Sequence, residues 1–259
     1  MGVRRGGLAV VGALLLLVGC RSSSHRMLEM PPGASGSLRV VVAPMNLALP
    51  LGPDLADAVD PVRGELIRYL QEHGSRVAVV WSPDASEVWR EAEAALAPEG
   101  GPAPPVEATA VAFARAVAAE SPFDLLVMPS LVYRDARVEG RVAYWDGVHR
   151  RIRFTLEPSA VPPTSVQPSE ARVEAAPGWR RFRGKITGVT LHALVLSGKG
   201  KILFQGFGGL DLVHDVREGK GADESLLRLQ SRPLQDAANV REGIAVALDP
   251  YLVARAASR

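Results

Sequence analysis

Three polar residues in the last fifth of the chain are of types that bind metal ions and transfer protons. Asp211, His214 and Asp215 lie within five positions of one another. Carboxylate and imidazole groups are ligands for transition metals, and imidazole is an acid–base group near neutral pH. The same cluster on a strand edge or in a turn is more often solvated polar surface. Both interpretations stay open: a metal or acid–base site, and plain surface.

A second group of residues has the chemistry of an anion-binding surface. Residues 149–153 read His-Arg-Arg-Ile-Arg, and residues 179–183 read Trp-Arg-Arg-Phe-Arg. Aromatic rings among cations suit nucleic acids, and the cations also suit anionic lipid head groups or an acidic protein. The alternative is a solvated strand face on which arginine stems cover apolar surface.

Two common catalytic signatures are missing from the sequence. It contains no G-x-S-x-G motif, which marks many hydrolases. The run Gly-Lys-Gly-Lys at 198–201 lacks the spacing of a phosphate-binding loop, and it is predicted to join two strands rather than a strand and a helix. We find no catalytic motif, and an enzyme is not the class that we expect.

The single cysteine, Cys20, lies at the end of an apolar segment. Arg4 and Arg5 precede the apolar residues 8–19. This run of about 12 residues is shorter than the roughly 20 that a membrane-spanning helix needs. The pattern predicts a cleaved signal peptide over residues 1–19. An ordinary secretory signal with a chance cysteine and a twin-arginine signal are the alternatives.

The tetrapeptide Leu17-Val18-Gly19-Cys20 resembles the lipobox of bacterial lipoproteins. The resemblance implies that Cys20 carries a diacylglycerol and an N-acyl chain such as palmitate, and that it becomes the first residue of the mature chain. Its thiol would then form a thioether, so no disulfide or cysteine nucleophile remains. Arg21 in place of Asp implies the outer membrane, facing the periplasm. An exported lipoprotein meets little nucleic acid, and no further cofactor is expected.

Composition indicates a folded domain behind this anchor. Hydrophobic residues make up 47% of the chain, which excludes a mostly disordered protein. Loss of Arg4 and Arg5 takes the formal net charge from +2 to zero, so charge alone indicates no partner. We expect a flexible tether over residues 20–37 that lifts the domain off the lipid, and one domain over residues 38–259.

The first half of this domain alternates strands and helices, which predicts an α/β sheet. One helix has an expected N-cap at Asp60, followed by Pro61, and it stops at His73-Gly74. Strands are expected over residues 38–44, 76–81 and 123–132, and helices over residues 60–72, 84–97 and 106–119.

The second half is predicted to hold two β-hairpins and a closing helix over residues 236–257. In the first hairpin, a three-residue loop over residues 145–147 would point the side chains of Val142 and Tyr144 inward. A two-residue turn is the alternative. The three-residue register gives an outward, basic face that we take as the predicted binding face, consisting of Arg141, His149, Arg151 and Arg153.

The second predicted hairpin joins residues 185–197 to residues 201–207 and places His192 opposite Gly206. Residues 157–178 contain five prolines and are expected to form a surface insertion. Together these elements predict an α/β fold (α+β mixed sheet), a single domain with helices packed on a mixed sheet plus two β-hairpins.

The order of elements over residues 38–207 resembles the small α/β domain shared by the N-terminal part of TolB, the curli-secretion lipoprotein and the lipoprotein activator of penicillin-binding proteins. The insertion at 157–178 departs from that pattern. The resemblance implies a non-enzymatic accessory lipoprotein that binds an envelope protein or polymer. The alternatives are a periplasmic metal-dependent enzyme that uses Asp211, His214 and Asp215, and a structural subunit of an envelope assembly.

Overall fold

The fold is described from a computed structural model of the whole chain, for residues 25–28, 37–79, 82–97, 101–152, 154–155, 183–218, 225–230 and 233–257. The predicted signal peptide, Cys20 and the predicted insertion at 157–178 lie outside these residues. So does Arg153 of the predicted binding face.

Four α-helices and eleven strands are described. The helices are α1 (Val59–Glu72), α2 (Ser82–Leu96), α3 (Val106–Glu120) and α4 (Ala237–Ala257), and a 3-10 helix covers Pro53–Ala58. The strands are β1 (His25–Met27), β2 (Arg39–Val42), β3 (Arg76–Val79), β4 (Leu125–Glu139), β5 (Val142–Trp145), β6 (Val148–Arg151), β7 (Phe154–Thr155), β8 (Arg183–Ser197), β9 (Ile202–Leu212), β10 (His214–Glu218) and β11 (Ser225–Leu229).

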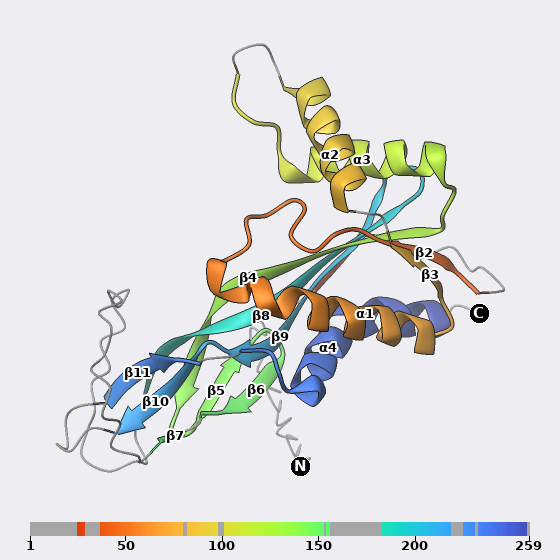
Figure 1. Cartoon of the computed structure of the whole chain (residues 1–259). Coiled ribbons are helices and arrows are strands. Elements are labelled where there is room, and N and C mark those ends of the chain that lie inside the picture. The colour runs from red at the N-terminus through yellow and green to blue at the C-terminus, as the bar shows by residue number, and fades with distance from the viewer. Residues whose placement is uncertain are drawn as a thin grey trace, which may run out of the picture.

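The larger sheet has eight strands, and its main path runs β1-β9-β8-β4-β2-β3. β2 is parallel to β3 and β4, whereas β8 is antiparallel to β4 and β9. β4 and β8 pair over fifteen positions, so they extend well beyond the four-residue β2 and β3 (Figure 1). The expected α/β class, with helices and strands in one fold, is confirmed.

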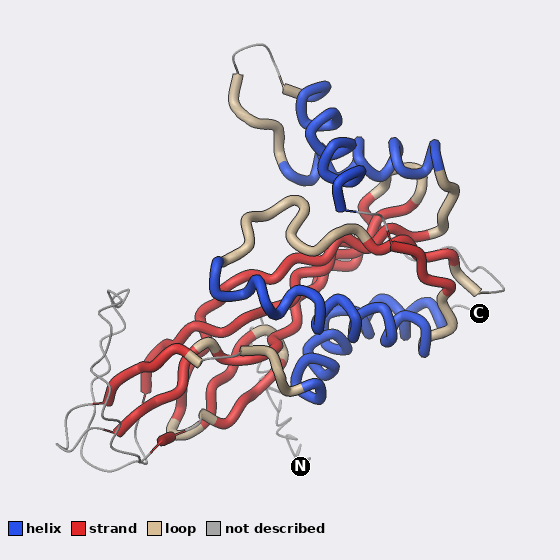
Figure 2. Tube along the Cα trace, viewed as in Figure 1, coloured by secondary structure: helices blue, strands red, loops and turns tan. Residues whose placement is uncertain are grey.

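Helices cover both faces of the sheet at the end where β2 and β3 lie (Figure 2). The apolar cluster on one face includes residues of α1 and α4, and the cluster on the other face includes residues of α3. Along β2, Val40 and Val42 belong to the first cluster and Val41 to the second. This is why the strand has a continuous apolar sequence rather than an alternating one.

Helix α1 buries one apolar face and begins earlier than the sequence predicts. Val62, Leu66, Tyr69 and Leu70 share a face by helical spacing, and all are buried. The helix stops where Gly74 takes a left-handed conformation with φ of 77°. The expected N-cap at Asp60 is wrong: the cap position is Ala58, with no side-chain hydrogen bond, because a 3-10 helix leads directly into α1.

Helix α4 lies against β9 at backbone contact. A Cβ atom built on Gly208 would lie 1.9 Å from the carbonyl oxygen of Gly243, and one built on Gly243 would lie 2.3 Å from the oxygen of Gly209. Only glycine allows this approach. Asp236 directly precedes the helix, and its carboxylate accepts hydrogen bonds from the amides of Ala238 and Asn239 at 3.0 and 3.2 Å. It continues through Pro250 to its end.

None of the described helices combines the length and the hydrophobicity that crossing a membrane requires.

The register predicted for the β5–β6 hairpin is wrong. Trp145 pairs with Val148, so the turn has two residues, Asp146 and Gly147, and both have positive φ. Aspartate and glycine tolerate this conformation, which matches the twist of a hairpin. Tyr144 therefore points outward and Trp145 inward, where its indole lies against Gly188, whose Cβ would be 2.6 Å from the ring.

The β8–β9 hairpin follows the expected pairing only at its turn. Leu196 pairs with Ile202, which is the register of the predicted His192–Gly206 pair, but a β-bulge then shifts the register by one residue. His192 consequently faces Phe207 instead of Gly206 and stacks on its ring with a centroid distance of 4.6 Å. The Nε2 atom of His192 lies 2.8 Å from the side-chain nitrogen of Gln205. Burial lowers the pKa of this imidazole.

Strand β1 was not expected, because it lies within the segment predicted to be a tether. Its three residues pair antiparallel with β9, with His25 opposite Gly206 and Met27 opposite Phe204. The amide of Leu28 extends the pairing with a 3.0 Å hydrogen bond to the carbonyl oxygen of Leu203. The ordered sheet thus includes residues only a few positions after Cys20.

Candidate functional site

A pocket of about 600 Å³ lies where β6, the end of β9 and the start of α4 meet. We call it the Arg150 pocket. Its lining residues are Val142, His149, Arg150, Arg151, Asp211, Leu212, Gln230, Asn239 and Glu242. Polar groups from segments far apart in the sequence therefore converge on one cavity.

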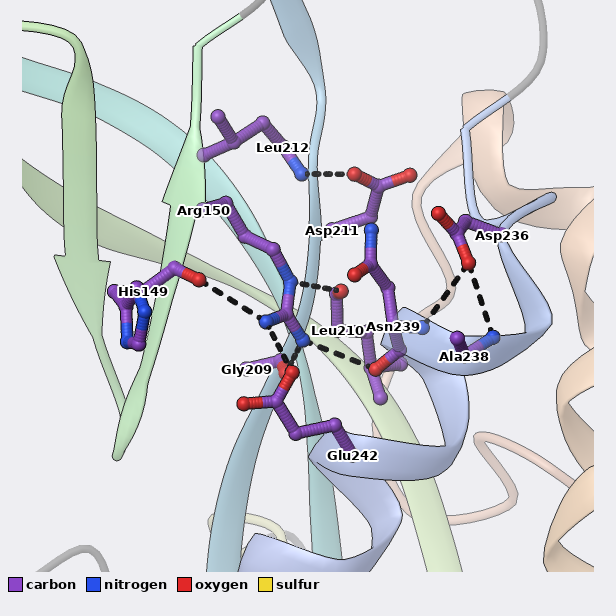
Figure 3. Close-up of polar contacts among 10 residues, drawn as sticks. All are labelled: His149, Arg150, Gly209, Leu210, Asp211, Leu212, Asp236, Ala238, Asn239 and Glu242. Carbon is purple, nitrogen blue, oxygen red and sulfur yellow. Dashed lines mark hydrogen bonds and ion pairs between the residues drawn. The ribbon is translucent and has the colours of Figure 1, made fainter.

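The guanidinium of Arg150 forms the floor of the pocket and is almost fully buried. Its Nε atom donates to the carbonyl oxygen of Leu210 at 3.2 Å, and one terminal nitrogen donates to the oxygens of Asn239 and Gly209 at 3.0 and 3.4 Å. The other terminal nitrogen donates to its neighbour's carbonyl oxygen at 3.1 Å and to Glu242 at 2.6 Å. Figure 3 shows this network.

All five donors of Arg150 are thus used by acceptors of the protein itself. A buried guanidinium is costly unless its donors and charge are satisfied. The acceptors come from β6, β9 and α4, so the side chain fastens the outer hairpin to the main sheet and to the first turn of the helix. Arg150 acts as a structural clamp rather than as a group that waits for a ligand.

Asp211 lines the same pocket but also has a structural task. Its carboxylate accepts the amide of Leu212 at 2.8 Å and the amide of Leu234 at 3.0 Å. The second bond holds the segment that leads into α4.

The three residues of the predicted metal or acid–base site do not all come from one sheet. Asp211 belongs to β9 of the larger sheet, whereas His214 and Asp215 belong to β10 of the three-stranded sheet β11-β10-β7. The side chain of Asp215 lies outside the described residues. Among the described residues there is no group of three or more His, Cys, Asp or Glu that could hold a metal ion.

Two residues of the predicted binding face lie at the pocket's outer edge. His149 and Arg151 flank Arg150 in β6 and point to the exposed side of the strand. We call these two residues the β6 rim. The ring of Tyr144, 46% exposed on the adjacent strand, has its centroid 6.3 Å from that of His149. In Figure 3 the imidazole points away from the Arg150 network.

Arg141 is placed close to the same rim. It lies in the turn between β4 and β5, it is exposed, and its carbonyl oxygen accepts the amide of Ile152 at 2.9 Å. The structure therefore brings Arg141 to the end of β6, beside Arg151. Arg141, His149 and Arg151 are all exposed, although the predicted hairpin register is wrong.

Charge is unevenly distributed around the Arg150 pocket. The β6 side presents Arg151, whereas the opposite wall carries the carboxylates of Asp211 and Glu242. Glu242 is half exposed but paired with Arg150. Among the described lining residues there is no Ser, Thr, Cys or Lys that would serve as a nucleophile. The arrangement suits binding of an acidic group at the β6 rim, with amide contacts from Gln230 and Asn239.

Sequence reasoning missed Arg150, Asn239, Gln230 and Glu242 as parts of the site. Arg150 could have been recognised from the sequence, because an arginine at an inward position between Val148 and Ile152 must find partners for its charge. Those partners could not be named, because α4 lies about 90 residues further along the chain.

Comparison of the chain with protein-family models, with curated proteins and with solved structures finds no match. What the domain does must therefore be inferred from its own residues.

Proposed function

We propose that this protein is a non-enzymatic binding protein of the bacterial cell envelope, anchored through lipidated Cys20 in the outer membrane and facing the periplasm. Its β6 rim, together with Arg141, would contact an acidic group of an envelope protein or polymer. The Arg150 pocket behind the rim would receive the polar part of that ligand.

The observation that carries this proposal is the division of roles between neighbouring arginines. Arg150 is 7% exposed and has all five donors bonded within the protein, whereas the Arg151 side chain is exposed. A rigid floor next to an exposed cation pre-organises a surface for charge recognition. It does not supply a nucleophile next to a base, which acyl-transfer chemistry needs.

The lipid anchor is supported by the sequence. Cys20 is the only cysteine of the chain, and it directly follows the apolar run that begins after Arg4 and Arg5. A membrane anchor and a charged contact face are compatible with a protein that positions a partner at the envelope.

The proposal also includes the predicted kinship with the α/β domain of TolB and of the related lipoproteins. Two features support it: two parallel strand pairs at one end of the sheet and a long hairpin, β8–β9, beside them. We infer a mixed sheet with two hairpins as the finer fold class.

Charge reversal at the rim tests the proposed contact. Envelope extracts would be passed over immobilised protein, and the captured material would be compared for the wild type, Arg151→Glu and a control, Arg90→Glu. Arg90 is exposed on α2, far from the pocket along the chain. We expect Arg151→Glu to abolish capture and Arg90→Glu to leave it unchanged, with equal unfolding midpoints. Equal capture by both variants would contradict the assignment of the rim.

Intact mass spectrometry of the membrane-extracted protein tests the anchor. The expected mass begins at an acylated Cys20 and is lost in Cys20→Ala. An unacylated chain cleaved at another position would contradict the lipoprotein assignment.

A further inference from the structure

β1 brings residues of the predicted tether into the sheet, where they form an edge next to the C-terminal part of α4. We propose that this edge lies against the lipid surface, so that the domain is held close to the membrane in one orientation. This inference rests on the proposed lipid anchor at Cys20.

The first argument is the length of the connection. His25 comes five positions after Cys20 and is already paired with Gly206. An extended chain spans at most about 3.6 Å per residue, so the lipidated residue lies within roughly 18 Å of β1. A tether reaching to β2, 19 positions after Cys20, would have allowed roughly 68 Å. The pairing of β1 removes most of that freedom.

The second argument is the chemistry of this edge. β1 lies beside α4, which packs on β9 and contacts β1. Two large apolar side chains are exposed here: Leu28, which directly follows β1, at 44%, and Val253 of α4 at 60%. Exposed Arg26 lies in β1. Apolar side chains beside a cation match an anionic lipid surface.

The opposite edge of the sheet provides the contrast. β3 is the last strand of the path that starts with β1, five strand spacings away. At about 4.8 Å per spacing, the two edges are roughly 24 Å apart. Exposed Val79 on β3 therefore marks the side that would face away from the membrane.

One consequence concerns the Arg150 pocket. Asp211 lies five residues along β9 from Gly206, which corresponds to roughly 17 Å. Added to the connection from Cys20 and to the spacing of about 5 Å between β1 and β9, this places the pocket within about 40 Å of the lipidated residue. A partner bound at the β6 rim would therefore lie close to the membrane surface.

Fluorescence quenching from within the bilayer tests the orientation. Full-length processed protein would be reconstituted into vesicles of phosphatidylethanolamine and phosphatidylglycerol that contain a nitroxide-labelled lipid. Because the thiol of Cys20 is occupied in the anchored form, a cysteine introduced by Val253→Cys or Val79→Cys is the single reactive thiol for a fluorophore. The two positions form a matched pair of exposed valines, one in α4, which contacts the edge strand β1, and one in the opposite edge strand β3.

We expect at least twofold stronger quenching for the label at position 253 than for the label at position 79. In the background of Arg26→Pro, which removes a backbone donor from β1, the labels at positions 253 and 79 should be quenched equally. Equal or reversed quenching in vesicle-bound protein without Arg26→Pro would overturn the orientation. Protein that fails to float with the vesicles would instead refute the lipid anchor, and the proposed orientation with it.

Discussion

The two ends of the long sheet are stabilised in different ways. At the end with β2 and β3, helices cover both faces and aliphatic side chains fill the space between the layers. At the other end, the β5–β6 hairpin folds over the sheet above a smaller cluster that includes Trp145 and Ile152, and it is fastened by Arg150. The comparison shows that many interchangeable contacts stabilise the first end, whereas a few specific contacts stabilise the second.

The contact between α4 and β9 connects the two ends, and breaking it should have the largest effect. In Gly208→Ala, the new Cβ would lie 1.9 Å from the carbonyl oxygen of Gly243, and backbone atoms cannot move without shifting the helix. We expect a loss of about 3 kcal/mol or more in the free energy of unfolding, because overpacking against backbone is at the costly end of such changes. Urea denaturation measures it.

Gly64→Ala is the matched control, because nothing lies within 4 Å of a Cβ atom at this exposed position of α1. It should stabilise the protein by about 0.5–1 kcal/mol, the usual gain for alanine over glycine inside a helix. Equal effects of the two alanine substitutions would show that α4 does not need the close contact.

Loss of the clamp should have the next largest effect. Arg150→Met keeps an apolar stem but leaves the buried carbonyl oxygens of Leu210 and Asn239 without these donors. We expect a loss of about 2–3 kcal/mol, since an unsatisfied buried acceptor costs about 1–3 kcal/mol. Hydrogen exchange should show faster opening of β6 than of β2. A uniform change in both strands would contradict a local clamp.

Arg241 in α4 allows a comparison with Arg150, because it is also an arginine that pairs with carboxylates. It bridges α4 to α1 through Glu65 at 3.1 Å and through Glu72, but its side chain is 42% exposed. Arg241→Gln should cost less than about 1 kcal/mol, because solvent screens the exposed Arg241–Glu72 pair and the buried Glu65 keeps its partner Arg68. A cost equal to that of Arg150→Met would show that burial does not separate the two arginines.

The smallest expected effect is on the pH dependence of stability, through His192, which lies between the two ends of the sheet. Burial lowers the pKa of His192, Arg134 lowers it further, and Glu107 opposes the shift. Below about pH 6.5 the unfolded chain takes up a proton that the folded protein resists, so stability should fall as the pH drops from about 7 to about 5. In His192→Gln this fall should be shallower. An unchanged slope would show that His192 is not the group responsible.

The helix-covered end could be predicted from the sequence because its information is periodic. The buried face of α1, the two-sided burial of β2 and the stop at Gly74 all follow from local patterns. The spacing of apolar residues reports which side of an element is buried, and glycine reports where the chain must turn.

The hairpin end could not be predicted in the same way. The register of β5–β6 depends on one left-handed aspartate, Asp146, and on an indole that fits against Gly188 and Gly209. Arg150 pairs with Glu242, 92 positions away. Such contacts leave no periodic signal, so the outward direction of Arg151 could be predicted but the pocket behind it could not.

In-cell photo-crosslinking tests most directly whether the β6 rim is the contact face. A photoreactive amino acid would replace His149 in the rim or, as a control, exposed Glu87 in α2. We predict a crosslinked product from position 149 that disappears when Arg151→Glu is added, and none from position 87. A product from position 87 with none from position 149 would contradict the proposed function of the rim.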